Sequence, residues 1–441
     1  MNDKLNLNKE QSYVRFLVLF ALLSAIIFTR YGLQINIPRE LALLPVAAIA
    51  LLGNQTEITA VCMCLIPFHE SLDFYIALII VVFIYVLKFH KRIKINMGFF
   101  LMLIIVIWEL LHSLTSDFSP ITFVTALSPI IALTVIICSD LSGIDYAFTV
   151  RAVSVAAVVT CFTMLIQIAW ISGFNVITFM LNLRRLGALS EASADRLQIT
   201  GGMVQTNSLG VICVLITAAL LQLRNIGKKK KSDTLMMLTL LIFGTLTASR
   251  TFIICLLLMI LLVFMGQKDG KTKLKYFGIA IIAAIFILSV LSIFFPDQLE
   301  FYISRFFEKD ITTGRDDLMV SYNRFITKNP SVMFFGVGLQ DLGNKLVNIY
   351  RVASNVPHNS IQEIMAAWGI EGLLFIGGLI LTLIVTAKKQ NRNIKLLNYI
   401  PLIIILFKSV AGQLLTSNYT VLTLGFAYIN MIQDLNKTEA Q

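Results

Sequence analysis

The sequence is dominated by apolar segments that are long enough, or nearly long enough, to cross a lipid bilayer. A membrane-spanning helix needs about 20 predominantly apolar residues. Because the chain is 57% hydrophobic and only 14% charged, the bilayer is the expected solvent. The sequence therefore predicts an all-α polytopic membrane protein with about 12 to 14 transmembrane helices. Its apolar segments lie at 14–29, 38–53, 57–69, 73–88, 97–113, 121–138, 148–171, 207–222, 234–248, 251–265, 276–294, 369–387, 397–412 and 419–432.

Basic residues in four links predict the orientation of these helices. Short cytoplasmic links of membrane proteins carry an excess of Lys and Arg. Threading fourteen spans through the four links places both termini in the cytoplasm. The net charge of +11 resides largely in these links, so no nucleic-acid partner is predicted; a phospholipid site at Lys228–Lys231 is the alternative to topology. The basic links are 88–94, 224–231, 268–275 and 388–395.

Two long hydrophilic connections then fall outside the cytoplasm, at 172–206 and 295–358. Loops of this length are usually functional or disordered. The second carries aromatic and apolar residues at helical spacing, which predicts short amphipathic helices on the membrane surface. We therefore divide the chain into N-terminal transmembrane helices, a core that includes both connections, and C-terminal transmembrane helices, with bounds 1–171, 172–387 and 388–441.

Three arginines lie on the side of the membrane that the distribution of basic links should deplete of positive charge. Arg196 and Arg315 stand in the long connections, and Arg250 stands in the short link before the apolar segment 251–265. An arginine at full membrane depth costs about 2.5–3.5 kcal/mol, so it usually extends to the interface or binds an anion. Because a guanidinium binds phosphate bidentately, these residues are candidates for binding a lipid-linked pyrophosphate. Extension to the interface is the alternative for Arg250.

His358 is the last of the four histidines and precedes a predicted membrane helix. A neutral imidazole, with its usual pKa of about 6.5, can take a proton from a hydroxyl at neutral pH. His358 is therefore the candidate general base, and a structural histidine at a helix mouth is the alternative. Asn359 is expected either to orient substrate or to cap a helix that starts at Ser360.

Glu109 and His112 are spaced three residues apart in IWELLHSL, on one helix face near its predicted outer end. Ionisable residues at such a depth are functional candidates by default. Glu109 is the next candidate for a base if His358 is not one. The alternative is that the two side chains satisfy each other while they pack the bundle.

Metal and thiol chemistry are not predicted. All six cysteines lie inside apolar segments, and the C-x-C at Cys62 and Cys64 lacks the partners of a zinc site. Asp316–Asp317 is the one acidic pair of the outer connections that resembles a metal-binding pair. We expect no cofactor and no divalent metal, although this pair leaves the question of a metal open.

Four motifs stand in order between about residues 190 and 385, and each includes one of the candidate residues. In this order they resemble the signature of the O-antigen polymerase and ligase family. Many members carry an acidic residue just before the glycine of G-I-x-G, where this chain has AAWGIEG with Glu363 and Glu371 nearby. The motifs are RLQITGGMVQTNSLGV, TASRTFIICLLL, GRDDLMVSYNRFITKNPSVMFFGVG and VPHNSIQEIMAAWGIEGLLFIGG.

The resemblance implies a membrane glycosyltransferase of the bacterial plasma membrane that acts on polyprenyl-pyrophosphate-linked oligosaccharides at the extracytoplasmic face. The three arginines would then bind the pyrophosphate, and His358 would accept the proton of the attacking sugar hydroxyl. Possible partners are a flippase and a chain-length regulator. A Lys- and Ile-rich composition mildly favours a polymerase over a ligase, because it is typical of low-GC organisms, some of which lack an outer membrane. A flippase or exporter of lipid-linked oligosaccharide is the alternative from another class.

Overall fold

The computed structural model is an assembly of helices, and its described part contains no strand. It describes residues 2–175, 206–266 and 315–433, together with isolated positions between 270 and 303. Short gaps within these ranges fall at 72, 115–118, 248, 341, 353–356, 411 and 418. Arg196 and most of the predicted span 276–294 therefore lie outside the described residues.

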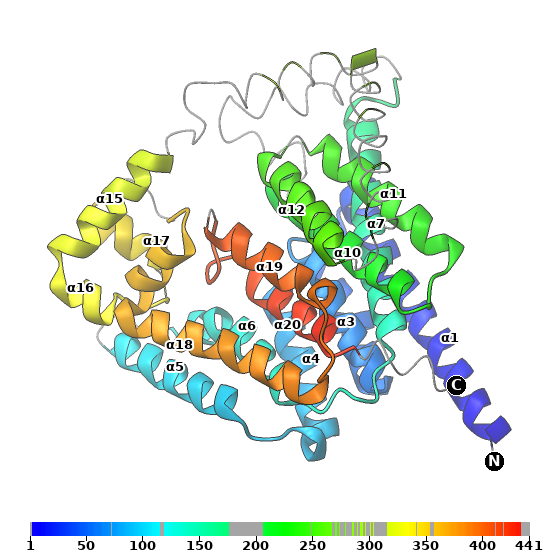
Figure 1. The fold of residues 1–441 in the computed structure, drawn as a ribbon, viewed down its shortest axis with the longest axis horizontal. Coiled ribbons are helices and arrows are strands. Elements are labelled where there is room, and N and C mark those ends of the chain that lie inside the picture. Colours follow the sequence, from blue (N-terminus) through cyan, green and yellow to red (C-terminus); the bar gives the residue numbers. More distant parts are fainter. Residues whose placement is uncertain are drawn as a thin grey trace.

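The N-terminal half forms helices that coincide with its seven predicted apolar segments (Figure 1). The first helix continues as a π-helical turn at Phe28–Gly32, and a 3₁₀ turn at Arg39–Ala42 precedes the second. The helices are α1 (Asn2–Ile27), α2 (Leu43–Leu52), α3 (Gln55–Phe68), α4 (Phe74–Phe89), α5 (Met97–Leu114), α6 (Pro120–Cys138) and α7 (Tyr146–Ile171).

The C-terminal half contains both long apolar helices and short helices. The short ones fall in the predicted connection 295–358, where α15 occupies the segment LMVSYNRFITKN and buries Tyr322, Phe325 and Ile326. The helices are α10 (Thr206–Asn225), α11 (Lys231–Leu246), α12 (Arg250–Gly266), α15 (Arg315–Lys328), α16 (Pro330–Phe335), α17 (Leu342–Asn344), α18 (Ser360–Gln390), α19 (Leu396–Val410) and α20 (Thr420–Met431).

Seven helices of the described part are long and apolar enough to cross a bilayer, so the chain is a polytopic α-helical membrane protein. Four further apolar helices, α3, α12, α19 and α20, are shorter. The predicted total of 12 to 14 spans thus remains a prediction. The seven candidate spans are Ser12–Gly32, Phe74–Arg92, Met97–Leu114, Pro120–Cys138, Tyr146–Trp170, Asn207–Asn225 and Ser360–Gln390.

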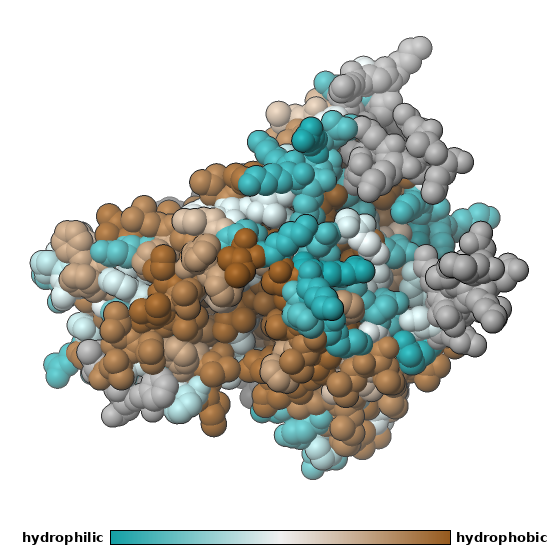
Figure 2. All heavy atoms as spheres, turned by 90° about the horizontal axis from the view of Figure 1, so that it is seen from below, coloured by the Kyte–Doolittle hydropathy of each residue, from teal (hydrophilic) through white to brown (hydrophobic). Residues whose placement is uncertain are grey.

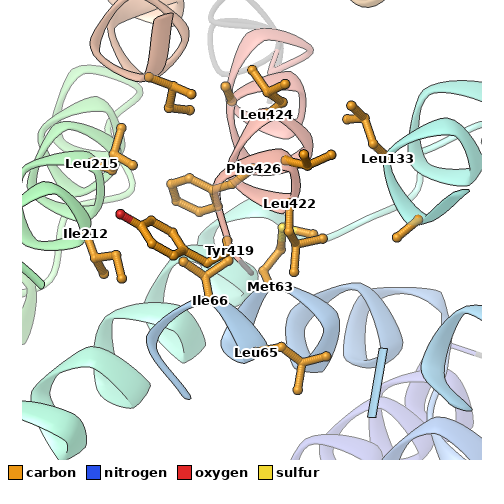
Figure 3. Packing of buried hydrophobic residues seen from close by; sticks show 14 of the residues in the cluster. Met63, Leu65, Ile66, Leu133, Ile212, Leu215, Tyr419, Leu422, Leu424 and Phe426 are labelled. Atoms are coloured by element: carbon orange, nitrogen blue, oxygen red, sulfur yellow. The ribbon is translucent and has the colours of Figure 1, made fainter. Parts of the chain in front are cut away.

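The two short helices α3 and α20 form the centre of the molecule. Every residue of both helices is buried. Figure 3 shows how Met63 and Ile66 of α3 meet Leu422 and Phe426 of α20, with Ile212 and its neighbours on α10 closing one side. Since the helices around them supply the outer surface, α3 and α20 can remain shorter than a full span.

The outer surface carries the apolar side chains that a bilayer would cover. Figure 2 shows hydrophobic atoms over much of the face seen from below Figure 1, where α5 and α18 run side by side. Leu103 and Ile107 of α5 and Leu374 and Leu381 of α18 are among the exposed side chains. A water-exposed surface of this kind would be an aggregation liability, whereas a lipid-facing surface requires it.

The three basic links that the structure describes, 88–94, 224–231 and 388–395, gather at one end of the bundle. Asn430 of α20 joins three other helices at this end. Its side chain accepts a hydrogen bond from Tyr146 of α7, and its carbonyl accepts from Gln222 of α10 at 3.2 Å and from Asn398 of α19 at 3.3 Å. The amide of Lys94 donates to the last residue of α6 at 2.8 Å. The opposite end of the bundle therefore contains the start of α12 and of α18, where Arg250 and His358 stand.

Candidate functional site

Helix α18 begins with a cap, and we call its N-terminal end, with His358 just before it, the mouth of α18. Asn359 is the N-cap: its side-chain oxygen accepts from the amides of Ile361 at 2.8 Å and Gln362 at 3.3 Å. Its side-chain nitrogen donates to the carbonyl of Val410, the last residue of α19, at 2.9 Å. His358, immediately before the cap, is half-buried. Of the two roles predicted for Asn359, the structure therefore shows capping, and the cap fixes the backbone next to His358.

Glu363, one turn after the cap, holds the link between α19 and α20 (residues 411–419) against α18. Its carboxylate is fully buried. One oxygen accepts from the amides of Leu414 at 2.7 Å and Leu415 at 2.9 Å. The other accepts from the Thr416 amide at 2.8 Å and from the Thr416 hydroxyl. Four donors thus stabilise the carboxylate, and no described cation forms an ion pair with it. The same donors shape the α19–α20 link beside His358.

Sequence reasoning singled out neither this role of Glu363 nor the α19–α20 link. Glu363 was one of two carboxylates considered for the acidic place in the family signature. The other, Glu371, stands two turns further along α18, where one of its oxygens is buried without a hydrogen bond. A carboxylate four residues after an Asn-Ser helix start was the available signal. The α19–α20 link gave no such signal, because it contributes backbone amides, which every residue type except proline has.

Helix α15 completes one side of the mouth. The Gln362 side chain donates to the Met319 carbonyl and to the Asn323 side chain, both at 2.8 Å. Burial, and secondly the Glu363 carboxylate, raise the pKa of the Tyr322 hydroxyl above its usual value. Arg315 is the first residue of α15, and its side chain, like that of Asp316, lies outside the described residues.

The G-x-G sequence is a backbone crossing and not a nucleotide-binding loop. Helix α18 is interrupted at Gly369, which has φ +68°, and Gly336 opposite has φ +75°. The amides of Val337 and Gly338 donate to the α18 carbonyls that the interruption leaves accessible, at 2.9 and 2.8 Å. A Cβ atom on Gly369 would stand 2.0 Å from the carbonyl oxygen of Phe334. Only glycine allows the two backbones to approach this closely.

Glu109 fastens this crossing to the N-terminal half of the chain. Its carboxylate is fully buried on α5. It accepts from the amides of Leu339 at 2.8 Å and Gln340 at 2.6 Å, and from the indole nitrogen of Trp368 at 2.6 Å. Because these donors occupy both oxygens, Glu109 is poorly suited to act as a general base.

His112 stands one turn further along α5, as predicted. Its imidazole packs edge-on against Trp108, with ring centroids 6.0 Å apart. The prediction that the two residues share one helix face is confirmed. The alternative of a mutually satisfied pair stays a prediction; the described donors to Glu109 are two amides that follow the G-x-G turn and the indole of Trp368.

Arg250 is held at the start of α12 by its neighbours in sequence. The Ser249 hydroxyl donates to the Asn207 side chain at 2.8 Å and accepts from the Phe252 amide at 3.3 Å. The Phe252 ring fills the space over Gly244, where a Cβ atom would lie 2.2 Å from it. The motifs that contain Asn207 and Ser249 therefore meet, and they fix the backbone from which Arg250 projects.

Arg250 and His358 lie at the same end of the bundle, on two sides of the end of α19. Helices α12 and α19 pack side by side (Figure 1). They are antiparallel, because Gly266 at the end of α12 lies against Leu397 at the start of α19. The start of α12 therefore lies near the end of α19, to which Asn359 is hydrogen-bonded. The residue before α18 and the first residue of α12 thus lie around the same helix end.

Thiol and metal sites are the remaining candidates. All six cysteines are buried and outside disulfides, as their apolar positions predict. In the described part of the chain, no three His, Cys, Asp or Glu side chains lie close enough together to hold a metal ion.

The fold and the site together define a polytopic α-helical membrane protein. Its candidate site lies at the end opposite the basic links, and hydrogen bonds between polar side chains and backbone amides hold it in place. Comparison with the models of known protein families gives no match, and no curated protein matches the sequence either.

Proposed function

We propose that the chain is a membrane glycosyltransferase that polymerises polyprenyl-pyrophosphate-linked oligosaccharide units into surface polysaccharide at the extracytoplasmic face. The observation that carries this proposal is the placement of His358 and Arg250 around the end of α19, opposite the basic links. A base and a phosphate-binding cation at one membrane surface are the groups that such a transfer needs. The ordered motifs that resemble the O-antigen polymerase and ligase family support the same chemistry.

In the proposed reaction a hydroxyl of the acceptor sugar attacks the anomeric carbon of the donor glycan. The new glycosidic bond forms as the bond from that carbon to the pyrophosphate oxygen breaks. His358 accepts the hydroxyl proton, and Arg250, with Arg196 and Arg315, stabilises the negative charge that develops on the leaving polyprenyl pyrophosphate. The products are a glycan longer by one donor chain and a free polyprenyl pyrophosphate, with no metal required.

The proposed orientation places the basic links in the cytoplasm and the site outside it. Single cysteines introduced at positions 196, 315 and 345 should react with a membrane-impermeant thiol reagent in intact cells. Cysteines at 229 and 390 should react only after the membrane is opened. The native cysteines are buried, so their background labelling should be low. Labelling at 229 without labelling at 315 would invert the topology and remove the basis of the proposal.

The guanidinium geometry of Arg250 provides a second prediction. Arg250→Lys should lower the extension rate nearly as much as Arg250→Ala, because a lysine keeps the charge but loses the bidentate fork. The rates are compared at equal amounts of folded protein in reconstituted vesicles. Lys389→Arg, an exposed substitution at the other end of α18, is the matched control and should retain the wild-type rate. Full activity of Arg250→Lys would leave Arg250 only a role in anchoring α12 at the interface.

The decisive experiment for the function is reconstitution with a defined acceptor. Purified protein given only lipid-linked repeat units should produce a ladder of longer lipid-linked chains. A ligase would leave the units unextended until a second acceptor lipid is added. A flippase would move the units across the vesicle membrane without forming any new glycosidic bond. Either of these two outcomes would replace the proposed polymerase activity.

A further inference from the structure

Lys408 is a cation in the last turn of α19 that the sequence analysis did not single out. Its ammonium nitrogen donates to the Gln413 carbonyl at 3.1 Å and to the Thr420 hydroxyl at 2.9 Å, and it stands 5.2 Å from the centroid of the Tyr419 ring. Among the described residues no carboxylate lies within salt-bridge distance of it. Two of its three N–H groups therefore have neutral acceptors, and within the described part of the chain its positive charge has no partner of opposite sign.

The position of the Lys408 side chain is fixed by the α19–α20 link. A Cβ atom at Gly412 would stand 3.3 Å from the Lys408 Cε atom, so the link packs directly against the aliphatic part of the lysine. Ser360 donates to the Gly412 carbonyl at 3.0 Å, which ties the same link to the start of α18. A half-buried cation held in this way is pre-organised, because little side-chain entropy remains to be lost on binding.

Lys408 lies between the two groups of the candidate site. On one side, the α18 residues that follow His358 bond to the last turn of α19 and to the link. On the other side, the Cys255 thiol of α12 lies within electrostatic range of Lys408, and Arg250 starts that helix little more than one turn earlier. The ammonium group is thus near the start of α12 and near the mouth of α18.

We propose that Lys408 binds the second phosphate of the polyprenyl pyrophosphate, next to the phosphate that Arg250 binds. This inference rests on the proposed function. One guanidinium fork pairs with the oxygens of one phosphate, and Lys408 is the described cation that lies between Arg250 and the mouth of α18, where it can offset charge on the other phosphate. An ammonium group acts as a point charge and tolerates the varied orientations of a phosphate that carries a long lipid. Lys408 therefore contributes to the preference for a pyrophosphate lipid over a monophosphate lipid, in addition to the roles proposed for Arg196 and Arg315.

A purely structural role is the competing explanation, since a lysine in the last turn of a helix also interacts favourably with the helix dipole. The two roles differ in selectivity. A helix-terminal interaction contributes to stability whatever lipid is bound. A phosphate contact contributes only when the second phosphate is present.

The test measures equilibrium binding of undecaprenyl pyrophosphate and undecaprenyl phosphate to purified protein in nanodiscs of uncharged lipid. Wild-type protein should bind the pyrophosphate lipid more tightly. Lys408→Gln keeps a donor for Gln413 and Thr420 but removes the charge, and it should weaken binding of the pyrophosphate lipid about tenfold, the effect of one charge-assisted contact. Binding of the monophosphate lipid should change little. Lys408→Arg should retain most of the preference, and Lys389→Gln, exposed at the opposite end, should retain all of it.

Several results would overturn the inference. An unchanged preference in Lys408→Gln, or an equal loss for both lipids, would show a structural role for Lys408 and would leave the proposed function standing. The absence of any preference in wild-type protein would contradict the pyrophosphate-linked substrate itself, and the inference with it. Displacement of the lipid by inorganic pyrophosphate at similar concentrations would assign the site to a free anion, and displacement by phosphatidylglycerol would assign it to a bulk membrane lipid.

Discussion

Replacement of His358 by alanine is expected to lower the rate of glycan extension by roughly 10²–10⁴-fold, the usual effect of removing a general base. The protein should still insert and bind the lipid-linked donor, because His358 precedes the helix cap and the capping bonds come from Asn359. The measurement is the initial rate of ladder formation in reconstituted vesicles, at equal donor occupancy. His358→Gln, which keeps a polar side chain without a basic nitrogen, should be similarly slow.

The matched control for His358→Ala is Asn359→Ala, a substitution of the neighbouring helix cap. Asn359→Ala removes the bonds to the start of α18 and to the end of α19, so it should cost stability, about 1 kcal/mol for the cap alone. Its extension rate per folded molecule should fall far less than that of His358→Ala. The wild-type rate should also decline as the pH is lowered, because an imidazolium cannot accept a proton. Retention of most activity and of the same pH profile in His358→Ala would exclude it as the base.

Replacement of Glu109 by alanine is expected to cause the largest loss of stability. The substitution leaves three buried donors, the amides of Leu339 and Gln340 and the indole of Trp368, without their acceptor. Unsatisfied buried groups of this kind cost about 1–3 kcal/mol each, so the total should be roughly 3–5 kcal/mol after local relaxation. In a chain of this length that loss should lower the apparent melting temperature by about 3–6 °C.

Two further variants test whether the loss of stability in Glu109→Ala comes from the missing hydrogen-bond acceptor. Glu109→Gln keeps one acceptor oxygen and should be intermediate, since its amide group then faces a donor. Glu40→Ala removes an exposed carboxylate and should leave the melting temperature within about 1 °C of wild type. Melting temperatures are compared in one detergent by intrinsic fluorescence. An unchanged melting temperature in Glu109→Ala would show that the crossing between α16 and α18 holds without α5.

The helices could be predicted because a bilayer imposes a simple requirement on them. Backbone groups in lipid must be bonded within their own segment, so each sufficiently long apolar run becomes a helix. The segment 97–113 is an example: the structure shows α5 there, with Glu109 and His112 on one face near its end. The interruption of α18 at Gly369 could not be predicted in this way, because the apolar pattern continues through it. Its cause is a backbone 33 residues earlier in the chain, at Gly336.

The candidate site was only partly predictable, for a related reason. His358, Asn359 and Arg250 carry distinctive side chains next to helix starts, which sequence reasoning can recognise. The contacts that organise the site join side chains to backbone amides. Glu363 bonds to amides about 50 residues away, in a link without charged residues. Such partners have no residue-type preference, so only the fold reveals them.

The separation in sequence between Glu109 and its donors has a consequence for how the protein is made. The first donor, the amide of Leu339, lies 230 residues downstream. Ribosomes add about 5–20 residues per second, so roughly 10–50 seconds pass between synthesis of the carboxylate and synthesis of its first partner. During that interval α5 carries a carboxylate that must stay hydrated or protonated at the bilayer edge. A nascent chain that stops before Leu339 lacks the amides that bond to the Glu109 carboxylate. The carboxylate without these bonds distinguishes such a chain from the full-length protein.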